Sequence, residues 1–337
     1  MSVETWPQLI AEAYGIGAVI SWTPAARGWA GATFHLVTSS GSYAAKEFLT
    51  QRPDVAAIES QVGFADACRA AGVPNPETLS TVHGTVLFHH PVTGRAWLVQ
   101  RWADGTVPER KDLPTACWLA HQAATIHRLG MPCAPAAQVN PFYTIARTGW
   151  AELADTARGA GFAWGQSLSD RVGEFEGLAA FVNGVPVGEV MTCHRDLKST
   201  NTLVAADGSR VLLDWDTSGP QQPWRELGML LLHHVGDDEA LQVIAAAYRA
   251  GGGEPVPDGP ELFATGLAVW LNFLYGQICG ALDLATDNRF RASAVVSAGH
   301  LIEGIPRLDA LRAAAHTTSR LQSRFGCAVS SRRWWLM

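Results

Sequence analysis

The sequence has few lysines and no excess of positive charge. Only three of its 25 basic residues are lysines, and the 337-residue chain has a formal net charge of −6. Because it has neither a basic excess nor a strong basic patch, we do not expect it to bind nucleic acid. With 47% hydrophobic residues it is too apolar for a disordered protein. Its length suits two domains with ample core.

The sequence also has no disulfide framework and no clear membrane or export signal. Its six cysteines are scattered without a Cys-x-x-Cys pair, which favours a reducing, cytoplasmic environment. The first fifteen residues have no basic region followed by an apolar run, so no secretory signal is indicated. Residues 262–282 are uncharged but contain Asn272, Gln277 and three glycines, and no basic residue lies near either end. We therefore interpret this segment as a buried helix of a protein without a membrane partner.

The pattern of predicted elements changes near residue 102. Before it, we expect an opening helix, a hairpin of strands 33–37 and 43–48, a helix from Asp54 to Gly72, and strands 82–89 and 96–101. After it, we expect helices at 112–129, within 148–180, and at 224–235, 237–250 and 260–285. The predicted fold class is therefore α+β, with a small sheet-containing domain at 1–102 and a larger, mostly helical domain at 103–337.

The strongest motif is His194-Arg-Asp-Leu-Lys-Ser-Thr-Asn201, followed by Leu-Leu-Asp214-Trp-Asp. Between the two parts lie two short apolar strands around Asp207-Gly208, and Asp-Gly favours a two-residue hairpin loop. In that register Asn201 would face Asp214. An amide oxygen beside a carboxylate suits a hard cation such as Mg²⁺. Asp196 is close enough in sequence to border the same cavity.

These motifs resemble those of the kinase-like small-molecule phosphotransferases, a group that includes aminoglycoside phosphotransferases and choline and homoserine kinases. The resemblance extends from Tyr14 to the segment around Trp270 and implies a bilobal, protein-kinase-like fold. It implies that Asp196 is the catalytic aspartate and that Asn201 and Asp214 are the metal ligands. It also implies that Lys46 binds the α- and β-phosphates of the nucleotide and that Lys198 contacts the γ-phosphate.

The resemblance extends to other nucleotide contacts. Glu59 matches the helix glutamate that pairs with Lys46, and it shares a predicted helix face with Val55 and Val62. The alternative is a solvated glutamate. Residues 28–33, including Gly31 and Thr33, occupy the place of the phosphate-covering loop without the full Gly-x-Gly-x-x-Gly pattern. Arg101 and Trp102 match the hinge whose backbone would meet a purine.

The sequence favours a small-molecule acceptor over a protein. The long segment that ends in Ala-Pro-Glu in protein kinases is absent, so the chain offers no peptide platform. Gly-x-x-x-x-Gly-Lys is absent too, which excludes a Walker-type loop. Glu226-Leu-Gly stands where the family usually has Asp-Leu-Ala, and the role of this longer side chain is open.

The resemblance thus implies an ATP- or GTP-dependent, Mg²⁺-dependent phosphotransferase that acts on a hydroxyl group. An antibiotic is the first choice of acceptor, either an aminoglycoside or another sugar- or nucleoside-containing compound, in resistance or self-resistance. A metabolic sugar, amino sugar, choline or homoserine is the alternative. A nucleotide-binding pseudokinase fits less well, because all the motif residues are intact. Residues 106–190 hold eight acidic and six basic residues, a balance that does not demand a cationic acceptor. Trp270 and Tyr275 could line the acceptor pocket or belong to the core.

Overall fold

The chain divides into two compact units. The computed structural model describes residues 6–27, 31–49 and 54–329. One unit comprises Met1–Arg110 with Lys198–Ser218, and the other Lys111–Leu197 with Gly219–Met337. We predicted a boundary at residue 102 and placed 198–218 in the second domain. This segment groups with the first unit because the Leu212 N–H donates to the Pro74 carbonyl (2.8 Å) and Thr106 bridges to Val204.

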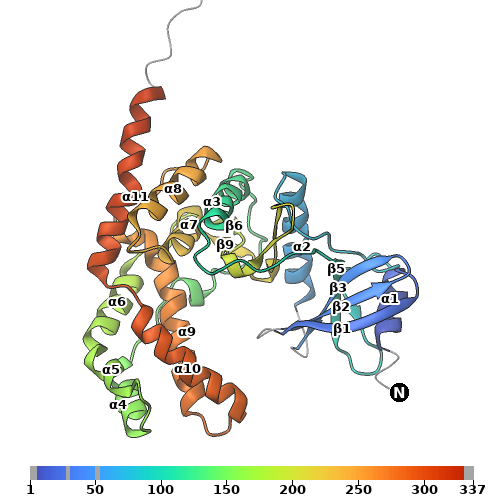
Figure 1. Ribbon diagram of the computed structural model, residues 1–337, viewed down its shortest axis with the longest axis horizontal. Helices are drawn as coiled ribbons and strands as arrows, with labels where there is room; N and C mark the ends of the chain where they lie inside the picture. The colour runs from blue at the N-terminus through green and yellow to red at the C-terminus, as the bar shows by residue number, and fades with distance from the viewer. Residues whose placement is uncertain (1–5, 28–30, 50–53, 330–337) are drawn as a thin grey trace, which may run out of the picture. The chain divides into compact units, whose positions relative to one another are not determined.

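The first unit contains a five-stranded antiparallel sheet in the order β1-β2-β3-β5-β4 (Figure 1). Its strands are β1 (Val19–Arg27), β2 (Gly31–Thr38), β3 (Gly41–Phe48), β4 (Phe88–His89) and β5 (Ala96–Arg101). Two helices, α1 (Trp6–Tyr14) and α2 (Val55–Ala70), accompany the sheet. The unit also contains the short hairpin of β7 (Thr202–Val204) and β8 (Arg210–Leu212), flanked by the 3-10 turns η3 (Ser199–Asn201) and η4 (Trp215–Thr217).

Local sequence signals explain most of this unit. The β2–β3 hairpin lies where the sequence predicted it, and Thr38 pairs with Gly41 next to its loop. Asp54 caps α2 by accepting the Ala57 N–H at 3.1 Å. Strand β1 was not predicted, because Pro24 lies in its middle. The strand tolerates this proline because it is at the sheet edge and bulges beside it.

The core of the first unit lies between α1 and the sheet. Ile10 and Ala11 of α1 are fully buried and belong to one cluster with Leu36, Tyr43 and Trp97. Burial of these side chains holds the sheet that carries Lys46.

The second unit is mostly helical. In chain order its helices are α3 (Leu113–Arg128), η2 (Pro141–Tyr143), α4 (Trp150–Gly159), α5 (Gly165–Asp170), α6 (Val172–Gly184), α7 (Pro223–Leu232), α8 (Asp238–Ala250), η5 (Pro260–Phe263), α9 (Ala264–Leu282), α10 (Asn288–Gly304) and α11 (Leu308–Val329). Strands β6 (Met191–Cys193) and β9 (Gly219–Gln221) form an antiparallel pair. Helices α10 and α11 were not predicted from the sequence. Gly228 lets α7 approach η5 closely, because a Cβ there would lie 1.7 Å from the Leu262 carbonyl oxygen.

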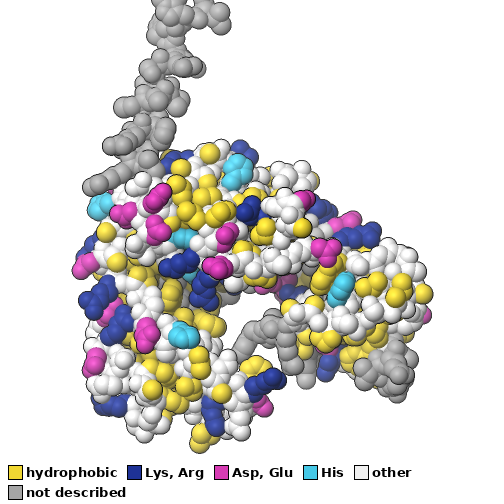
Figure 2. All heavy atoms as spheres, in the orientation of Figure 1, with side chains coloured by type: hydrophobic (Ala, Val, Ile, Leu, Met, Phe, Trp, Pro, Cys, Tyr) yellow, Lys and Arg dark blue, Asp and Glu magenta, His cyan; other side chains and the backbone are white. Residues whose placement is uncertain are grey.

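Helix α9 accounts for the uncharged segment. Among the described residues, Pro260–Leu282 is the one helical stretch long and apolar enough to cross a membrane, and over half of its most apolar part is buried within the protein. It packs against α6, α7 and α10, as a core helix does. Hydrophobic side chains also reach the surface over α9 and α10 (Figure 2), among them Phe273 and Phe290.

Candidate active site

Two motif residues adopt a strained backbone conformation. Among the described residues other than glycine, Arg195 (φ 68°) and Asp214 (φ 63°) are the two with positive φ. This left-handed conformation costs a non-glycine residue about 1–3 kcal/mol, and such strain concentrates at functional sites. Arg195 belongs to the His-Arg-Asp motif and Asp214 follows the hairpin. The backbone thus marks both halves of the predicted motif.

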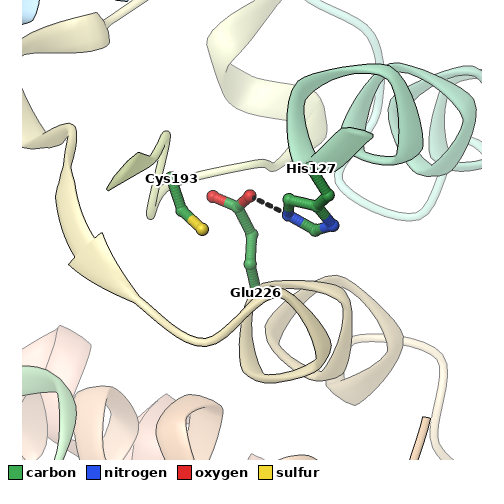
Figure 3. A group of neighbouring side chains, drawn as sticks. All are labelled: His127, Cys193 and Glu226. Atoms are coloured by element: carbon green, nitrogen blue, oxygen red, sulfur yellow. Dashed lines mark hydrogen bonds and ion pairs between the residues drawn. The ribbon is translucent and has the colours of Figure 1, made fainter. Parts of the chain in front are cut away.

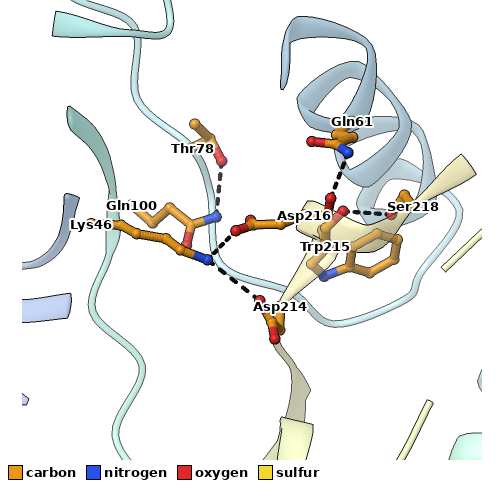
Figure 4. A network of polar contacts seen from close by, with 8 residues as sticks. All are labelled: Lys46, Gln61, Thr78, Gln100, Asp214, Trp215, Asp216 and Ser218. Carbon is orange, nitrogen blue, oxygen red and sulfur yellow. Dashed lines mark hydrogen bonds and ion pairs between the residues drawn. The ribbon is translucent and has the colours of Figure 1, made fainter. Parts of the chain in front are cut away.

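In the first unit, Lys46 contacts two aspartates that follow the hairpin (Figure 4). Its Nζ lies 3.4 Å from Asp214 Oδ1 and still closer to a carboxylate oxygen of Asp216. Burial by itself lowers the pKa of Lys46, but the charges of Asp216 and Asp214 outweigh it and raise the pKa. Lys46 is therefore a fixed cation beside the predicted metal-binding segment.

The predicted partner of Lys46, Glu59, does not contact it. Glu59 is exposed, as its alternative interpretation as a solvated glutamate predicts. The sequence analysis placed Glu59 on an inward face of α2 together with Val55. Val55 is itself exposed, and the buried face of α2 contains Ile58 instead. Gln61 takes the inward position instead, and its amide donates to the Asp216 backbone carbonyl at 2.5 Å.

Asp216 is the functional candidate that the sequence analysis missed. Its signal was a second aspartate two residues after Asp214, in Asp-Trp-Asp. The Trp215 ring between them packs edge-on against Phe64 of α2, with 5.7 Å between ring centroids. This packing and the Gln61 hydrogen bond fix η4 against α2, so that the Asp216 carboxylate is held at the lysine.

The β7–β8 hairpin differs by one residue from the predicted register. Thr202 pairs with Leu212, and the Leu213 N–H donates to the Asn201 carbonyl at 2.8 Å. Asn201 therefore lies opposite Leu213 rather than Asp214. The loop has three residues instead of two, and Gly208 adopts the left-handed conformation (φ 83°) at its end. Asp214 lies just beyond the ladder, where the chain turns into η4.

Gly31 and Thr33, from the predicted phosphate-covering segment, border Lys46. Thr33 pairs with Lys46 across β2 and β3. A Cβ on Gly31 would lie 2.7 Å from the Glu47 carbonyl oxygen and 3.3 Å from Lys46 Cε. The close approach of β2 to the lysine thus requires glycine here. Gly28 and the two residues after it lie outside the described residues.

The predicted hinge is engaged by its neighbours. The Arg101 N–H donates to the Glu77 carbonyl at 2.8 Å, and the Trp102 N–H to the Ser42 carbonyl at 3.1 Å. These two N–H groups therefore have partners within the protein, and the contact of the hinge backbone with a purine stays a prediction. The Trp102 ring stacks on His35, with 3.9 Å between centroids.

In the second unit, Glu226 holds the His-Arg-Asp loop. It is 1% exposed, and its Oε2 lies 2.7 Å from His127 Nε2 while its Oε1 accepts the Arg195 N–H. Burial by itself raises the pKa of Glu226, but the hydrogen bond and charge of His127, the charge of His194 and the Arg195 N–H together lower it. Glu226 is thus a buried carboxylate that braces the backbone beside Asp196.

Glu226, His127 and Cys193 could also be considered as a metal site (Figure 3). Their ligand atoms lie within 4.8 Å of one another, and all three residues are buried. However, the imidazole is hydrogen-bonded on both sides, to Glu226 and to Tyr248 Oη at 2.8 Å. Since a peptide N–H also points at the carboxylate, we assign this cluster to holding the loop.

The remaining predicted residues have different surroundings. Asp196 is partly buried, and its N–H donates to His194 Nδ1 at 3.3 Å. Lys198 is partly buried at the start of η3, where its carbonyl accepts the Asn201 N–H. Trp270 joins α9 to α10 by donating to the Leu301 carbonyl (3.1 Å), and its contact with an acceptor stays a prediction. The Arg147 guanidinium lies over the Tyr275 ring, with its Cζ 6.0 Å from the ring centroid.

Comparison with known proteins gives a family and a fold. The model of the "Phosphotransferase enzyme family" matches residues 21–263. An aminoglycoside phosphotransferase from Alicyclobacillus acidocaldarius is similar over 94% of this chain and 96% of its own (TM-score 0.63, 16% identity). A spectinomycin phosphotransferase solved with ADP and spectinomycin is similar over 95% and 99% (TM-score 0.64, 12% identity). An amicoumacin kinase solved with AMP-PNP and Ca²⁺ is similar over 91% and 95% (TM-score 0.60, 14% identity).

Proposed function

We propose, from the premise that this chain belongs to the phosphotransferase enzyme family, that it transfers the γ-phosphoryl group of ATP or GTP to a hydroxyl group of a small molecule. The observation that carries the proposal is the contact of Lys46 with Asp214 and Asp216, about which a nucleotide site can be built. It joins a strand lysine to carboxylates 168 and 170 residues later in the chain, and the first of these, Asp214, has a left-handed backbone conformation.

The residues around Lys46 suit a magnesium nucleotide. Asp214 and Asn201 would hold Mg²⁺, because a carboxylate and an amide supply the hard oxygen donors that this ion prefers. The Asp214 side chain is 43% exposed, so a cation could approach it from solvent. When bound, Mg²⁺ would neutralise charge on the phosphates. Lys46 would contact the α- and β-phosphates, and Lys198 the γ-phosphate.

Asp196 would act on the acceptor. Its carboxylate takes the proton of the acceptor hydroxyl while the hydroxyl oxygen bonds to the γ-phosphorus. The bond from that phosphorus to the β–γ bridging oxygen breaks, and the nucleoside diphosphate leaves. Glu226 would support this step by fixing the Arg195 backbone next to Asp196, since transfer depends on the position of the groups.

An antibiotic is the acceptor we favour. The spectinomycin and amicoumacin kinases noted above support this class, and their adenine nucleotides favour ATP over GTP. The sequence also lacks the peptide platform that a protein acceptor would need.

A screen tests the proposal. The full-length protein is incubated with Mg²⁺ and either ATP or GTP, together with a panel of hydroxyl-bearing antibiotics, sugars, choline and homoserine. Mass spectrometry then detects acceptors that gain one phosphate. We expect a gain that depends on nucleotide and acceptor, with an antibiotic as the best acceptor. Turnover of choline or homoserine alone would assign a metabolic role, and no gain on any acceptor would count against the proposal.

A further inference from the structure

Residues 142–147, which run from within η2 toward α4, have their backbone fixed by one side chain of α9. The Asn272 amide donates to the carbonyl oxygens of Phe142 (2.9 Å) and Ile145 (2.7 Å). Its own carbonyl oxygen accepts the Arg147 N–H at 2.8 Å. Three hydrogen bonds from one asparagine hold residues 142–147 in a single shape, so this segment is preorganised.

Two further contacts fix the same segment and join it to the His-Arg-Asp loop. Asn183 of α6 bonds both the N–H (2.8 Å) and the carbonyl (3.1 Å) of Ala146. The Arg195 guanidinium lies over the Tyr143 ring, 4.7 Å from its centroid. The segment therefore contacts the residue that immediately precedes Asp196, which would take the acceptor proton.

The fixed backbone holds apolar side chains out to solvent. Phe142 is 40% exposed and Ile145 is 56% exposed, although the carbonyl oxygens of both residues accept hydrogen bonds from Asn272. Burying these two side chains would have been favourable, and the hydrogen bonds instead keep them outward. A rigid, apolar surface next to a catalytic loop is typical of a ligand site.

The segment itself carries positive charge and no negative charge. No aspartate or glutamate occurs between Asp112 and Glu152, and α9 carries no charged residue at all. Arg147 is exposed at one end of the segment, and Arg195 lies at the other. Carboxylates lie on neighbouring parts of the chain: Asp196 follows Arg195, and Glu176 of α6 accepts the Trp150 N–H at 2.8 Å. At residues 142–147 themselves, a polycation would meet the like charge of Arg147.

We infer that residues 142–147 form the acceptor-binding surface and that the acceptor has an apolar face and no net positive charge. This inference rests on the proposed function and narrows it, because it excludes polycationic aminoglycosides. Phe142 and Ile145 contact the apolar face of the acceptor. Arg147 contacts the polar or anionic groups of the acceptor. The acceptor hydroxyl then faces Asp196.

A binding experiment tests this without turnover. Saturating Mg-ADP first occupies the nucleotide site of the full-length protein. Calorimetry then follows titration with 8-anilinonaphthalene-1-sulfonate, an apolar anion, and separately with kanamycin, a polycation. We expect one saturable site for the sulfonate and none for kanamycin. Phe142→Ala and Ile145→Ala should each weaken sulfonate binding by about tenfold, the scale of one lost apolar contact. Arg147→Gln should weaken it in a salt-dependent way.

Phe290→Ala is the matched control, because Phe290 is an exposed aromatic residue of α10 outside the segment and should leave the affinity unchanged. Each variant replaces an exposed side chain, and melting curves confirm that it folds. Saturable kanamycin binding would overturn the inference, as would equal affinities in the Phe142, Ile145 and Phe290 variants. Failure of Mg-ADP to bind is a separate result, which would count against the proposed function. The sulfonate titration would still test whether residues 142–147 form a binding surface.

Discussion

Replacing Asp216 with asparagine removes the charge that lies closest to Lys46 and keeps the shape of the side chain. The Lys46 side chain is 19% exposed and that of Asp216 is 35% exposed. The pair therefore lies between an exposed ion pair, worth less than about 1 kcal/mol, and a buried one, whose disruption costs about 3–5 kcal/mol. We expect Asp216→Asn to lower the free energy of unfolding by about 2 kcal/mol. Because the same pair positions Lys46 for the phosphates, a comparable loss of about 2 kcal/mol in the transition state would lower kcat/KM for the nucleotide roughly 30-fold.

Steady-state kinetics with varied Mg-ATP measure this effect, and Glu59→Gln is the control. Glu59 lies on α2 but is exposed, so neutralising it should change kcat/KM by less than about twofold. The double variant Lys46→Met/Asp216→Asn should be little worse than Lys46→Met, because the two residues act as one unit. The reasoning is refuted if the two losses are fully additive, or if Glu59→Gln costs as much as Asp216→Asn.

Three further changes test other parts of the structure. Asp214→Ala should weaken Mg-nucleotide binding in calorimetry more than Asn201→Ala, since only the first removes a charge from the cation site, and equal effects would contradict the assignment. Glu226→Gln should lower the free energy of unfolding by about 3 kcal/mol at pH 7. Because the pKa of Glu226 is lowered by folding, its ionised form stabilises the fold above the ordinary pKa of 4.5, and this stabilisation is lost as the pH falls through the pKa of the folded state. Urea unfolding below pH 4.5 should therefore show a smaller difference in stability between variant and wild type. A larger difference would contradict the argument. Gly31→Ala should lower the melting temperature, because the added Cβ would contact the Glu47 backbone. Gly63→Ala on α2 should raise it slightly, because the added Cβ meets open space and alanine favours a helix. The reverse order would contradict the close approach of β2 to β3 at Gly31.

Elements with strong local signals could be predicted from the sequence. The cap at Asp54, the cap at Asp112 and the breaks at Gly72 and Gly130 all mark helix ends in the structure. Each depends on neighbouring residues only. Helices α10 and α11 were not predicted. Helix α10 buries only Ala294, Ala298 and Ile302, which is a weak apolar pattern for a helix of 17 residues.

Side-chain partners were harder to predict because they depend on packing between distant segments. The partner of Lys46 is decided by η4 packing against α2 through Trp215, which brings Asp216 inward and leaves Glu59 in solvent. The hairpin register depended on whether Asp207-Gly208 closed a two- or three-residue loop, and a single residue changed what faces Asn201. Both errors involve the residues nearest to the predicted chemistry.

The role of Glu226 needed the structure for the same reason. The sequence showed only that glutamate stands where the family usually has aspartate. His127, 99 residues earlier, hydrogen-bonds one carboxylate oxygen of Glu226. This contact orients the glutamate side chain so that its other oxygen accepts the Arg195 N–H. No local pattern around His127 indicates this pairing.

The central claim, phosphoryl transfer assisted by Asp196, is tested most directly by comparing the wild type with Asp196→Asn on the acceptor found in the screen. Calorimetry first establishes that both proteins are saturated with Mg-ATP, and ³¹P NMR then follows phosphate on ATP, ADP and the acceptor. We predict that the wild type moves one phosphate to the acceptor for each ADP formed. The variant should bind Mg-ATP within about threefold of the wild type but transfer phosphate roughly a thousandfold more slowly. Transfer by Asp196→Asn at close to the wild-type rate would contradict the account.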